Sequence, residues 1–215
     1  ITSIKGYVEG LRDGVAATEE MRDKYLNTIY IKASAMEKMV EQMSDLSELE
    51  LGKMRFDFKV EDGGGFVEDI LDEFRSDLDD ETTLDYSPPI GRIKLVMDRE
   101  KLRRVFANIL GNAVKYREKG RPLKIGVTAE IKDRGLYVIV RDNGKGIPQE
   151  DINRVFDTFY RSDPARSEVK GHGLGLAISK QIVERHHGKI WLKSEENIGT
   201  EVYIYLPEYK EEHKV

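Results

Sequence analysis

The first fifty residues carry apolar side chains at helical spacing. A short helix is predicted at the start of the chain and a longer one over Glu19–Glu50, a stretch without glycine or proline. Thr18 is placed to cap the second helix. The apolar side chains of that helix recur every three or four residues, as in a coiled-coil seam: Met36, Met39, Met43 and Leu46. Because one helix cannot bury such a stripe, we expect either a hairpin that dimerises into a four-helix bundle or a core helix within a monomer.

After Leu51 the apolar pattern changes from helical to alternating. A period of two predicts a strand over residues 51–60, and the change of pattern places a domain boundary near Gly52. The stretch GGGF at 63–66 is expected to be an unstructured start to a helix that reaches Leu78. Two short strands are expected within residues 84–97, around a Ser-Pro-Pro-Ile-Gly turn.

The remaining elements alternate between helices and paired strands. Asp98 is expected to cap an amphipathic helix that ends near Tyr116. A short helix at 149–156, a mobile polar loop at 157–172 and a helix ending near Gly188 are also expected, the last with His186 and His187 as cations at its negative end. Strands are predicted near 122–132, 136–141, 189–194 and 201–206. The order predicts an α+β fold, with one mostly antiparallel sheet and helices on one face.

Composition excludes several classes of protein. The chain has 215 residues, 35% of them charged, and a net charge of −5, which argues against a nucleic-acid partner. The absence of cysteine excludes disulfides and thiolate metal sites. No apolar run of about 18 residues is present, so we expect no membrane contact from this stretch. Since it neither opens with Met nor carries a signal peptide, we expect a fragment of a longer protein from a reducing, cytoplasmic setting.

Two stretches present polar groups suited to a nucleotide. Asn108, Asn112 and Lys115 share one helix face, where two amides and an ammonium can hold a hydrated divalent ion and phosphates. The same spacing is also that of an ordinary solvated face. In DNGKGIP, 142–148, Asp142 ends a strand and can accept from an amino group, while Gly144 and Gly146 allow a flat ligand to approach the backbone. That stretch alone is equally a common turn.

Two further stretches flank the polar loop. Residues 155–161, VFDTFYR, hold an aromatic pair that on its own predicts core residues. Residues 171–176, GHGLGL, place alternating glycines before a helix, where free N–H groups and the positive helix end favour an anion. Their spacing fits neither a P-loop nor a dinucleotide loop.

The order of these stretches is more specific than any one of them. An Asn-rich helix, Asp-x-Gly-x-Gly, a Phe loop, Gly-x-Gly-x-Gly and then Gly-Thr at 199–200 resemble the ATP-binding domain of sensor histidine kinases, across residues 98–206. The first fifty residues resemble that family's dimerisation and phosphotransfer hairpin. The resemblance implies a hairpin at 1–52, a Bergerat-type ATP-binding domain at 53–209, an α/β sandwich, and a tail at 210–215. It also implies ATP and Mg²⁺ as cofactors, and a homodimer and a response-regulator receiver domain as partners.

The resemblance assigns roles residue by residue. Asp142 would bind the adenine amino group, with Thr200 acting through a water, and Asn112 would be the Mg²⁺ ligand. Arg161, in a lid at 157–172, would reach the γ-phosphate and stabilise its charge during transfer. The other implied contacts to phosphates, sugar or base are Asn108, Lys115, Tyr116, Gly144, Gly146, Gly171, His172, Gly173, Leu174, Gly175 and Leu176. Arg161, Lys115 and Asn108 would act in catalysis.

Asn108 bears on the reaction. Related ATPases of this fold generally carry a glutamate there that activates water, and an amide cannot act as a general base. The residue therefore favours phosphoryl transfer to a protein nucleophile. An ATPase, a serine kinase and a non-catalytic nucleotide-sensing dimer remain alternatives.

The chain departs from the family at its start. Its opening, ITSIKGY, aligns with the last part of the phosphoacceptor motif, which places that motif's histidine six residues before Ile1. None of the four histidines present takes its place. We therefore expect this fragment to bind ATP without phosphorylating itself at the usual site, and we expect the parent protein to be anchored in the cell membrane, as in most of the family.

Overall fold

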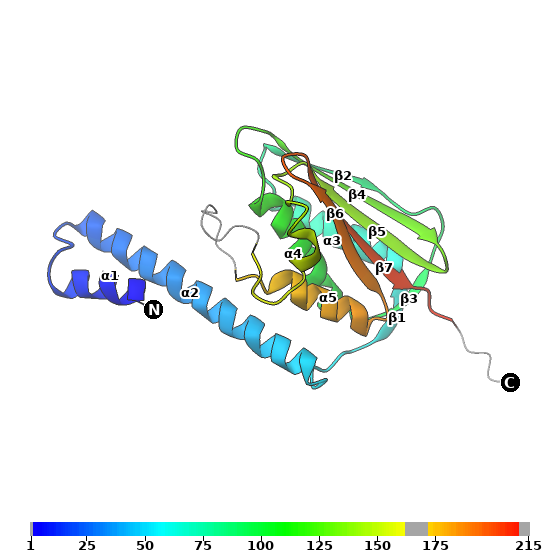
Figure 1. Cartoon of the computed structure of the whole chain (residues 1–215), viewed down its shortest axis with the longest axis horizontal. Coiled ribbons are helices and arrows are strands. Elements are labelled where there is room, and N and C mark those ends of the chain that lie inside the picture. Colours follow the sequence, from blue (N-terminus) through cyan, green and yellow to red (C-terminus); the bar gives the residue numbers. More distant parts are fainter. Residues whose placement is uncertain (1, 162–171, 211–215) are drawn as a thin grey trace. The chain divides into compact units, whose positions relative to one another are not determined.

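The computed structural model of the chain describes residues 2–161 and 172–210, which fall into two compact units, Ile1–Glu50 and Leu51–Val215 (Figure 1). The first unit is a helical hairpin of α1 (Thr2–Arg12) and α2 (Glu19–Glu50). Thr18 does cap α2, since its hydroxyl accepts from the Met21 N–H at 3.2 Å.

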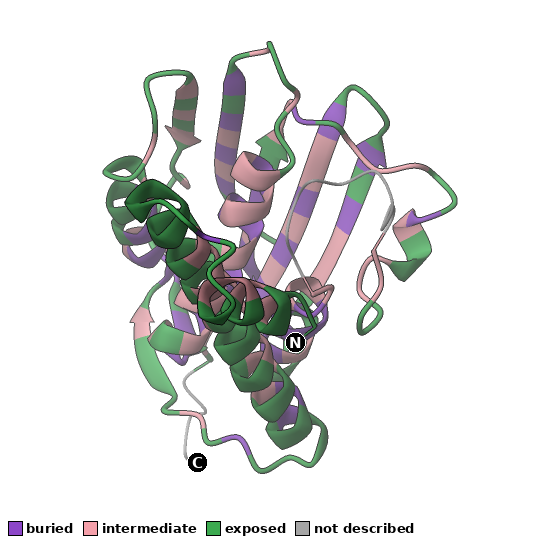
Figure 2. Cartoon of the chain, turned by 90° about the vertical axis from the view of Figure 1, so that its left-hand side faces the viewer, coloured by how far each residue is buried: buried purple, intermediate pink, exposed green. Residues whose placement is uncertain are grey.

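The long helix leaves most of its apolar stripe exposed. Of its residues only Leu46 and Leu49 are buried, whereas Met36, Val40 and Met43 are 37%, 65% and 46% exposed (Figure 2). Tyr7 and Tyr25 meet edge to face at 5.0 Å and join α1 to α2. The stripe is therefore largely uncovered in the single chain.

The second unit is a sheet covered on one face by helices, which confirms the expected α+β class (Figure 1). Its five-stranded sheet has the order β2-β4-β5-β7-β6, and only the β2–β4 pair is parallel. The strands are β2 (Thr82–Ser87), β4 (Leu123–Lys132), β5 (Gly135–Asp142), β6 (Lys189–Glu195) and β7 (Gly199–Pro207). A separate ribbon pairs β1 (Lys59–Asp62) with β3 (Lys94–Met97). The helices are α3 (Gly63–Arg75), α4 (Arg99–Lys115) and α5 (Gly175–Arg185).

The predicted strand over 51–60 is wrong for most of its length, because only β1 pairs there. The alternating rings of Phe56 and Phe58 instead stack on each other at 5.4 Å and pack edge-on against His186. The apolar side chains therefore alternate because both rings pack against His186, and not because this segment pairs with a neighbouring strand.

Three other local predictions are corrected. The GGGF stretch is helical from its first residue, because the Asp62 carboxylate caps α3 by accepting from the Gly64 N–H at 3.3 Å. That helix ends at Arg75, and the short helix expected at 149–156 is a single 3₁₀ turn, η1 (Ile152–Arg154). The two strands expected within 84–97 are confirmed as β2 and β3, which belong to different sheets.

Helix α4 is oriented by its apolar side. Leu102, Val105, Phe106, Ile109 and Leu110 are all buried against the sheet and the neighbouring helices, as expected. Asp98 caps the helix, since its carboxylate accepts from the Lys101 N–H at 3.0 Å. The helix therefore presents its amide-bearing side away from the core.

Candidate functional site

Helices α4 and α5 pack together, and Asn108 lies at their contact. Its side-chain amide donates to the Ser179 hydroxyl at 3.1 Å, and Ser179 is buried on α5. Gly175, the first residue of α5, leaves room for this amide, because a β-carbon there would collide with the Asn108 side-chain oxygen. Asn108 and the first turn of α5 therefore form one polar surface.

The N-terminus of α5 has no side-chain cap. Its N-cap residue, Leu174, is fully buried. Gly173 accepts the Phe159 N–H on its carbonyl at 3.0 Å, which attaches the segment before Arg161 to the glycine stretch. Unpaired N–H groups at a helix start form an anion site. His172 and Leu176 are half-buried beside it, and Gly171 and the loop at 162–170 lie outside the described residues.

A second polar cluster surrounds Asp142. This residue ends β5 and pairs with Thr200 on β7, while the Gly144 N–H donates to its carboxylate at 2.8 Å. Burial raises the pKa of Asp142, although the N–H groups of Gly144 and Thr200 and the charge of Arg121 act to lower it. A half-buried carboxylate of raised pKa is suited to accept a hydrogen bond from a ligand amino group.

Ser194 organises the surroundings of Asp142, and the sequence reasoning missed it. Its hydroxyl donates to the Gly199 carbonyl, accepts from the Ile147 N–H and lies beside the Thr200 hydroxyl, each at 2.8 Å. The signal was present, because strand alternation after Ile190 puts Ser194 on the apolar face of the sheet. A polar residue at an inward position indicates a buried network.

The loop after Asp142 fits closely against the rest of the domain. Gly146 has φ of 68°, and a β-carbon there would collide with the Glu195 carbonyl. A β-carbon on Gly144 would lie 2.8 Å from the Tyr116 carbonyl. Neighbouring backbone lies so close to both positions that each requires glycine, whether or not a ligand approaches.

The cations of the site lie near its polar face. The Lys115 ammonium is 4.8 Å from the centre of the Tyr116 ring, at the end of α4. Asn112 is half-buried one turn earlier on the same face, and Arg161 is the last described residue before the gap. The loop after Asp142 reaches this end of α4, because the Lys145 N–H donates to the Tyr116 carbonyl at 3.0 Å.

These groups fit a magnesium nucleotide. The Asp142 cluster offers a carboxylate to a base, and the start of α5 offers N–H groups to phosphates. Among the described residues no group of three or more histidine or acidic side chains could hold a metal. A cation here would therefore depend on the Asn112 amide oxygen and on phosphate oxygens, the mixed coordination that Mg²⁺ accepts.

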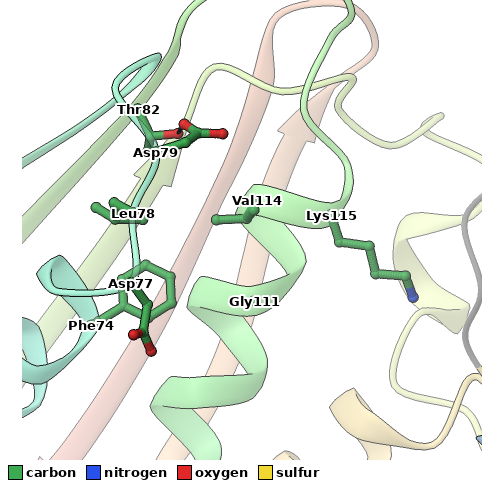
Figure 3. A pocket seen from close by; sticks show the side chains of 8 residues that line it. All are labelled: Phe74, Asp77, Leu78, Asp79, Thr82, Gly111, Val114 and Lys115. Atoms are coloured by element: carbon green, nitrogen blue, oxygen red, sulfur yellow. Dashed lines mark hydrogen bonds between the residues drawn. The ribbon is translucent and has the colours of Figure 1, made fainter.

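A cavity of about 280 Å³ lies on another flank of α4, between the helix and the segment from Phe74 to Thr82. Figure 3 shows the Lys115 ammonium pointing away from Phe74 and Leu78, which line this cavity. The cavity is therefore separate from the two polar clusters.

Family models match both units. Residues 97–210 match the model described as histidine kinase-, DNA gyrase B- and HSP90-like ATPase, and residues 1–52 match the His Kinase A phospho-acceptor domain. The sensor protein kinase WalK of Staphylococcus aureus is 33% identical over 208 residues, covering 96% of this chain and 50% of that protein. The chain thus spans about half the length of this relative.

Solved structures share the fold. The histidine kinase AdeS of Acinetobacter baumannii matches with a TM-score of 0.70 and 23% identity, covering 97% of this chain and 95% of that one. The histidine kinase ThkA, solved with the response regulator TrrA, matches with a TM-score of 0.74 and 24% identity, covering 96% and 57%. Within the described residues, no helix combines the length and apolar character needed to cross a membrane.

Proposed function

The chain belongs to the sensor histidine kinases, as a core of phospho-acceptor-type hairpin and ATPase-type domain, and on that premise we propose that it binds ATP with Mg²⁺ and transfers the γ-phosphoryl group to a histidine. The phosphohistidine would then donate its phosphoryl group to an aspartate of a response regulator. The observation that carries the proposal is the half-buried Asp142 carboxylate, fixed by the Gly144 N–H at 2.8 Å beside Thr200.

Asp142 supports adenine as the base. Its half-buried carboxylate is an acceptor, and the exocyclic group of adenine is an amino donor. Guanine presents a carbonyl oxygen at the corresponding position, which a carboxylate would repel. Ser194 supports this role by holding the hydroxyl of Thr200 beside the strand end that carries Asp142.

The start of α5 supports phosphate binding. Its N–H groups lack a side-chain cap, and Asn108 is held against this turn by Ser179. Asn112 would supply the amide ligand to Mg²⁺, which when bound neutralises charge on the phosphates. Lys115 and Arg161 would stabilise the transferring group.

Asn108 favours transfer over hydrolysis. An amide cannot remove a proton from water, so the domain has no general base at this position. A neutral imidazole needs no such base, because its unperturbed pKa of about 6.5 leaves it largely unprotonated near neutral pH.

The accepting histidine would be none of those in the described domain. Both ring nitrogens of His186 are bonded inside the fold, to the Asp98 N–H at 2.9 Å and the Ile182 carbonyl at 2.8 Å. The match of residues 1–52 to the phospho-acceptor model supports a histidine of that domain as the acceptor, which the alignment of the opening motif would place six residues before Ile1.

The exposed stripe of α2 supports a homodimer. Met36, Val40 and Met43 are exposed at the spacing of a helical seam, and a second hairpin would cover them. The ThkA structure is a complex with a response regulator, which supports a receiver domain as the second partner of this chain.

Calorimetric titration with a non-hydrolysable ATP analogue and Mg²⁺ tests the nucleotide site. We expect saturable binding that Asp142→Asn weakens and that Asp85→Asn, at an exposed position of β2, leaves unchanged. Equal binding by both variants and the parent chain would remove Asp142 from the site.

A second assay tests the reaction. With labelled ATP, we expect acid-labile phosphate on a version extended upstream through the missing histidine, and none on the 215-residue chain. Steady phosphate release without a phosphoprotein would instead establish the ATPase alternative.

A further inference from the structure

Arg121 connects two loops that border Asp142. It lies between α4 and β4, and its guanidinium donates to the Gly144 carbonyl at 2.9 Å and to the Asn197 carbonyl at 3.2 Å. The first carbonyl belongs to the loop that follows Asp142, and the second to the β6–β7 hairpin. Both loops lie at the same end of the five-stranded sheet, next to where Asp142 pairs with Thr200 (Figure 1).

Residues of the two loops also contact Asp142 directly. Gly144 donates its N–H to Asp142, so the carbonyl that Arg121 holds belongs to the residue that orients the carboxylate. The Asn197 N–H donates to the Lys145 carbonyl at 2.6 Å, which joins the loops a second time. Gly199 packs so closely that a β-carbon there would collide with the Asp142 carbonyl. A change in the spacing of the loops would therefore move Asp142.

The Arg121 side chain is half-buried. Its Nε is buried and has no hydrogen-bond partner within the described residues. A half-buried cation with both terminal nitrogens on carbonyl oxygens can act on a nearby carboxylate with less screening than a fully exposed one. Its charge lowers the pKa of Asp142, in the direction opposite to burial.

We propose that Arg121 is a positioning residue of the nucleotide site: by bridging Gly144 and Asn197 it sets the spacing of the two loops and keeps the Asp142 carboxylate aimed at the amino group of the base. This rests on the proposed function, since it assigns the base to Asp142. Arg121 contacts carbonyl groups of the protein, so its effect on the nucleotide passes through Asp142.

Two substitutions distinguish the effect of the Arg121 charge from the effect of its two hydrogen bonds to the loops. Arg121→Lys keeps a cation but loses the planar fork that reaches two carbonyl groups. Arg121→Gln loses the charge and keeps at most one of the donors. Arg141→Gln is the matched control, because Arg141 lies on β5 next to Asp142 in the sequence, yet its half-exposed guanidinium pairs with Glu201 at 2.6 Å.

The experiment measures dissociation constants for ATP and GTP analogues with Mg²⁺ by calorimetry, and follows the Asp142 carboxyl carbon by NMR against pH in the nucleotide-free chain. We expect Arg121→Gln to weaken ATP binding about tenfold or more, consistent with the cost of losing a charged hydrogen-bond partner, to narrow the preference for ATP over GTP, and to shift the Asp142 titration to higher pH. Arg121→Lys should weaken binding while shifting the titration less. Arg141→Gln should change neither quantity.

Several outcomes overturn the proposal. Wild-type affinity in Arg121→Gln, or an Asp142 titration unmoved by it, would do so. Weaker binding with an unchanged preference for ATP over GTP would reduce Arg121 to a general structural contact, as would an equal effect of Arg141→Gln. If Arg121→Gln does not fold, the lysine variant decides between these outcomes. A wild-type chain that binds no adenine nucleotide defeats the proposed function instead, and the nucleotide-free titration still tests whether Arg121 controls Asp142.

Discussion

The two ends of the α4–α5 pair use the same kinds of residue to opposite effect. At the end where α4 begins, the Asp98 carboxylate accepts from the Asp57 N–H at 2.8 Å and the Lys101 N–H at 3.0 Å. The N–H of Asp98 in turn donates to His186. We call this the closed end, because its polar groups are paired within the protein. At the other end, which we call the open end, α5 begins without a side-chain cap beside Asn108, and the loop after Asp142 returns to the last residue of α4.

The difference shows how the domain separates stability from binding. At the closed end the polar groups of Asp98 and His186 have partners, so their burial costs little free energy. Asp142 is held in position by backbone N–H groups, yet burial still raises its pKa. A ligand that donates a hydrogen bond to this carboxylate would lower the free-energy cost of desolvating its charge. Part of the binding free energy would therefore come from a cost that the fold already carries.

The histidines illustrate the same contrast. His186 was expected to be a cation at the end of its helix, and this is wrong, because burial lowers its pKa. Its ring bonds require one neutral tautomer, with Nδ1 donating to Ile182 and Nε2 accepting from Asp98.

The largest effect is expected from Asp98→Ala at the closed end. It removes the α4 cap and leaves the Asp57 N–H without an acceptor, and should lower the free energy of unfolding by about 2 kcal/mol. Urea denaturation measures this. Asp62→Ala is the control, because Asp62 caps α3 through one bond at 3.3 Å and should cost about 1 kcal/mol.

The nucleotide affinity of the folded Asp98→Ala protein should stay within about twofold of the parent, since the two ends share no polar contact in the described structure. A tenfold loss of affinity would show that the closed end controls the open one, and the comparison would fail.

The next effect is expected from Asp142→Asn at the open end. An asparagine that keeps the Gly144 bond presents its NH₂ group to the base, so affinity for ATP should fall about tenfold, or about 1.4 kcal/mol. Stability should stay equal or rise. Because the pKa of Asp142 is raised in the fold, its stabilising contribution is complete below the unfolded pKa and is lost as pH rises through the folded one.

At neutral pH the charge of Asp142 is thus a net cost that asparagine removes. Thermal denaturation at pH 7 checks this expectation. A variant that loses both affinity and several degrees of melting temperature would place Asp142 among the structural residues instead.

A third effect is expected on acidification. Since the pKa of His186 is lowered in the fold, its contribution to stability is complete above about pH 6.5, the unfolded value. It declines as pH falls toward the folded pKa, because the unfolded chain takes up the proton first. The free energy of unfolding should therefore fall between pH 7 and pH 5.5.

His186→Asn should flatten this part of the profile of unfolding free energy against pH. His187→Gln is the control and should leave this part of the profile unchanged. His187 is the next residue in the sequence, but its side chain is exposed. Parallel profiles in all three proteins would show that other groups set the acid response.

Residues whose position follows from periodicity were predictable from the sequence. Thr18 and Asp98 cap helices as expected, and the strand expected near 122–132 forms as β4 with alternating burial. The order of the short motifs along the chain indicated the family, because that order is more specific than any single motif. The roles of the individual site residues stay predictions that the binding experiments above would test.

The unpredicted features depend on contacts between distant segments. Arg121 follows a Lys-Gly turn with no local pattern, and its function arises only where two loops meet. Phe56 and Phe58 alternate like a strand, yet a histidine 128 or more positions later decides their conformation. Sequence spacing along one element cannot report a partner on another element.

The smallest effect is expected from Gly111→Ala, midway between the two ends of α4. Nothing lies within 4 Å of a β-carbon placed there, because Gly111 borders the cavity of about 280 Å³ (Figure 3). Alanine restricts the unfolded chain and favours the helix, so stability should rise by about 0.5–1 kcal/mol, with unchanged nucleotide affinity. Gly175→Ala is the contrasting variant, since its β-carbon would displace the Asn108 amide and should weaken nucleotide binding. Chemical denaturation and calorimetry of both would distinguish a glycine beside open space from one that the open end requires, and equal effects of the two on affinity would contradict that distinction.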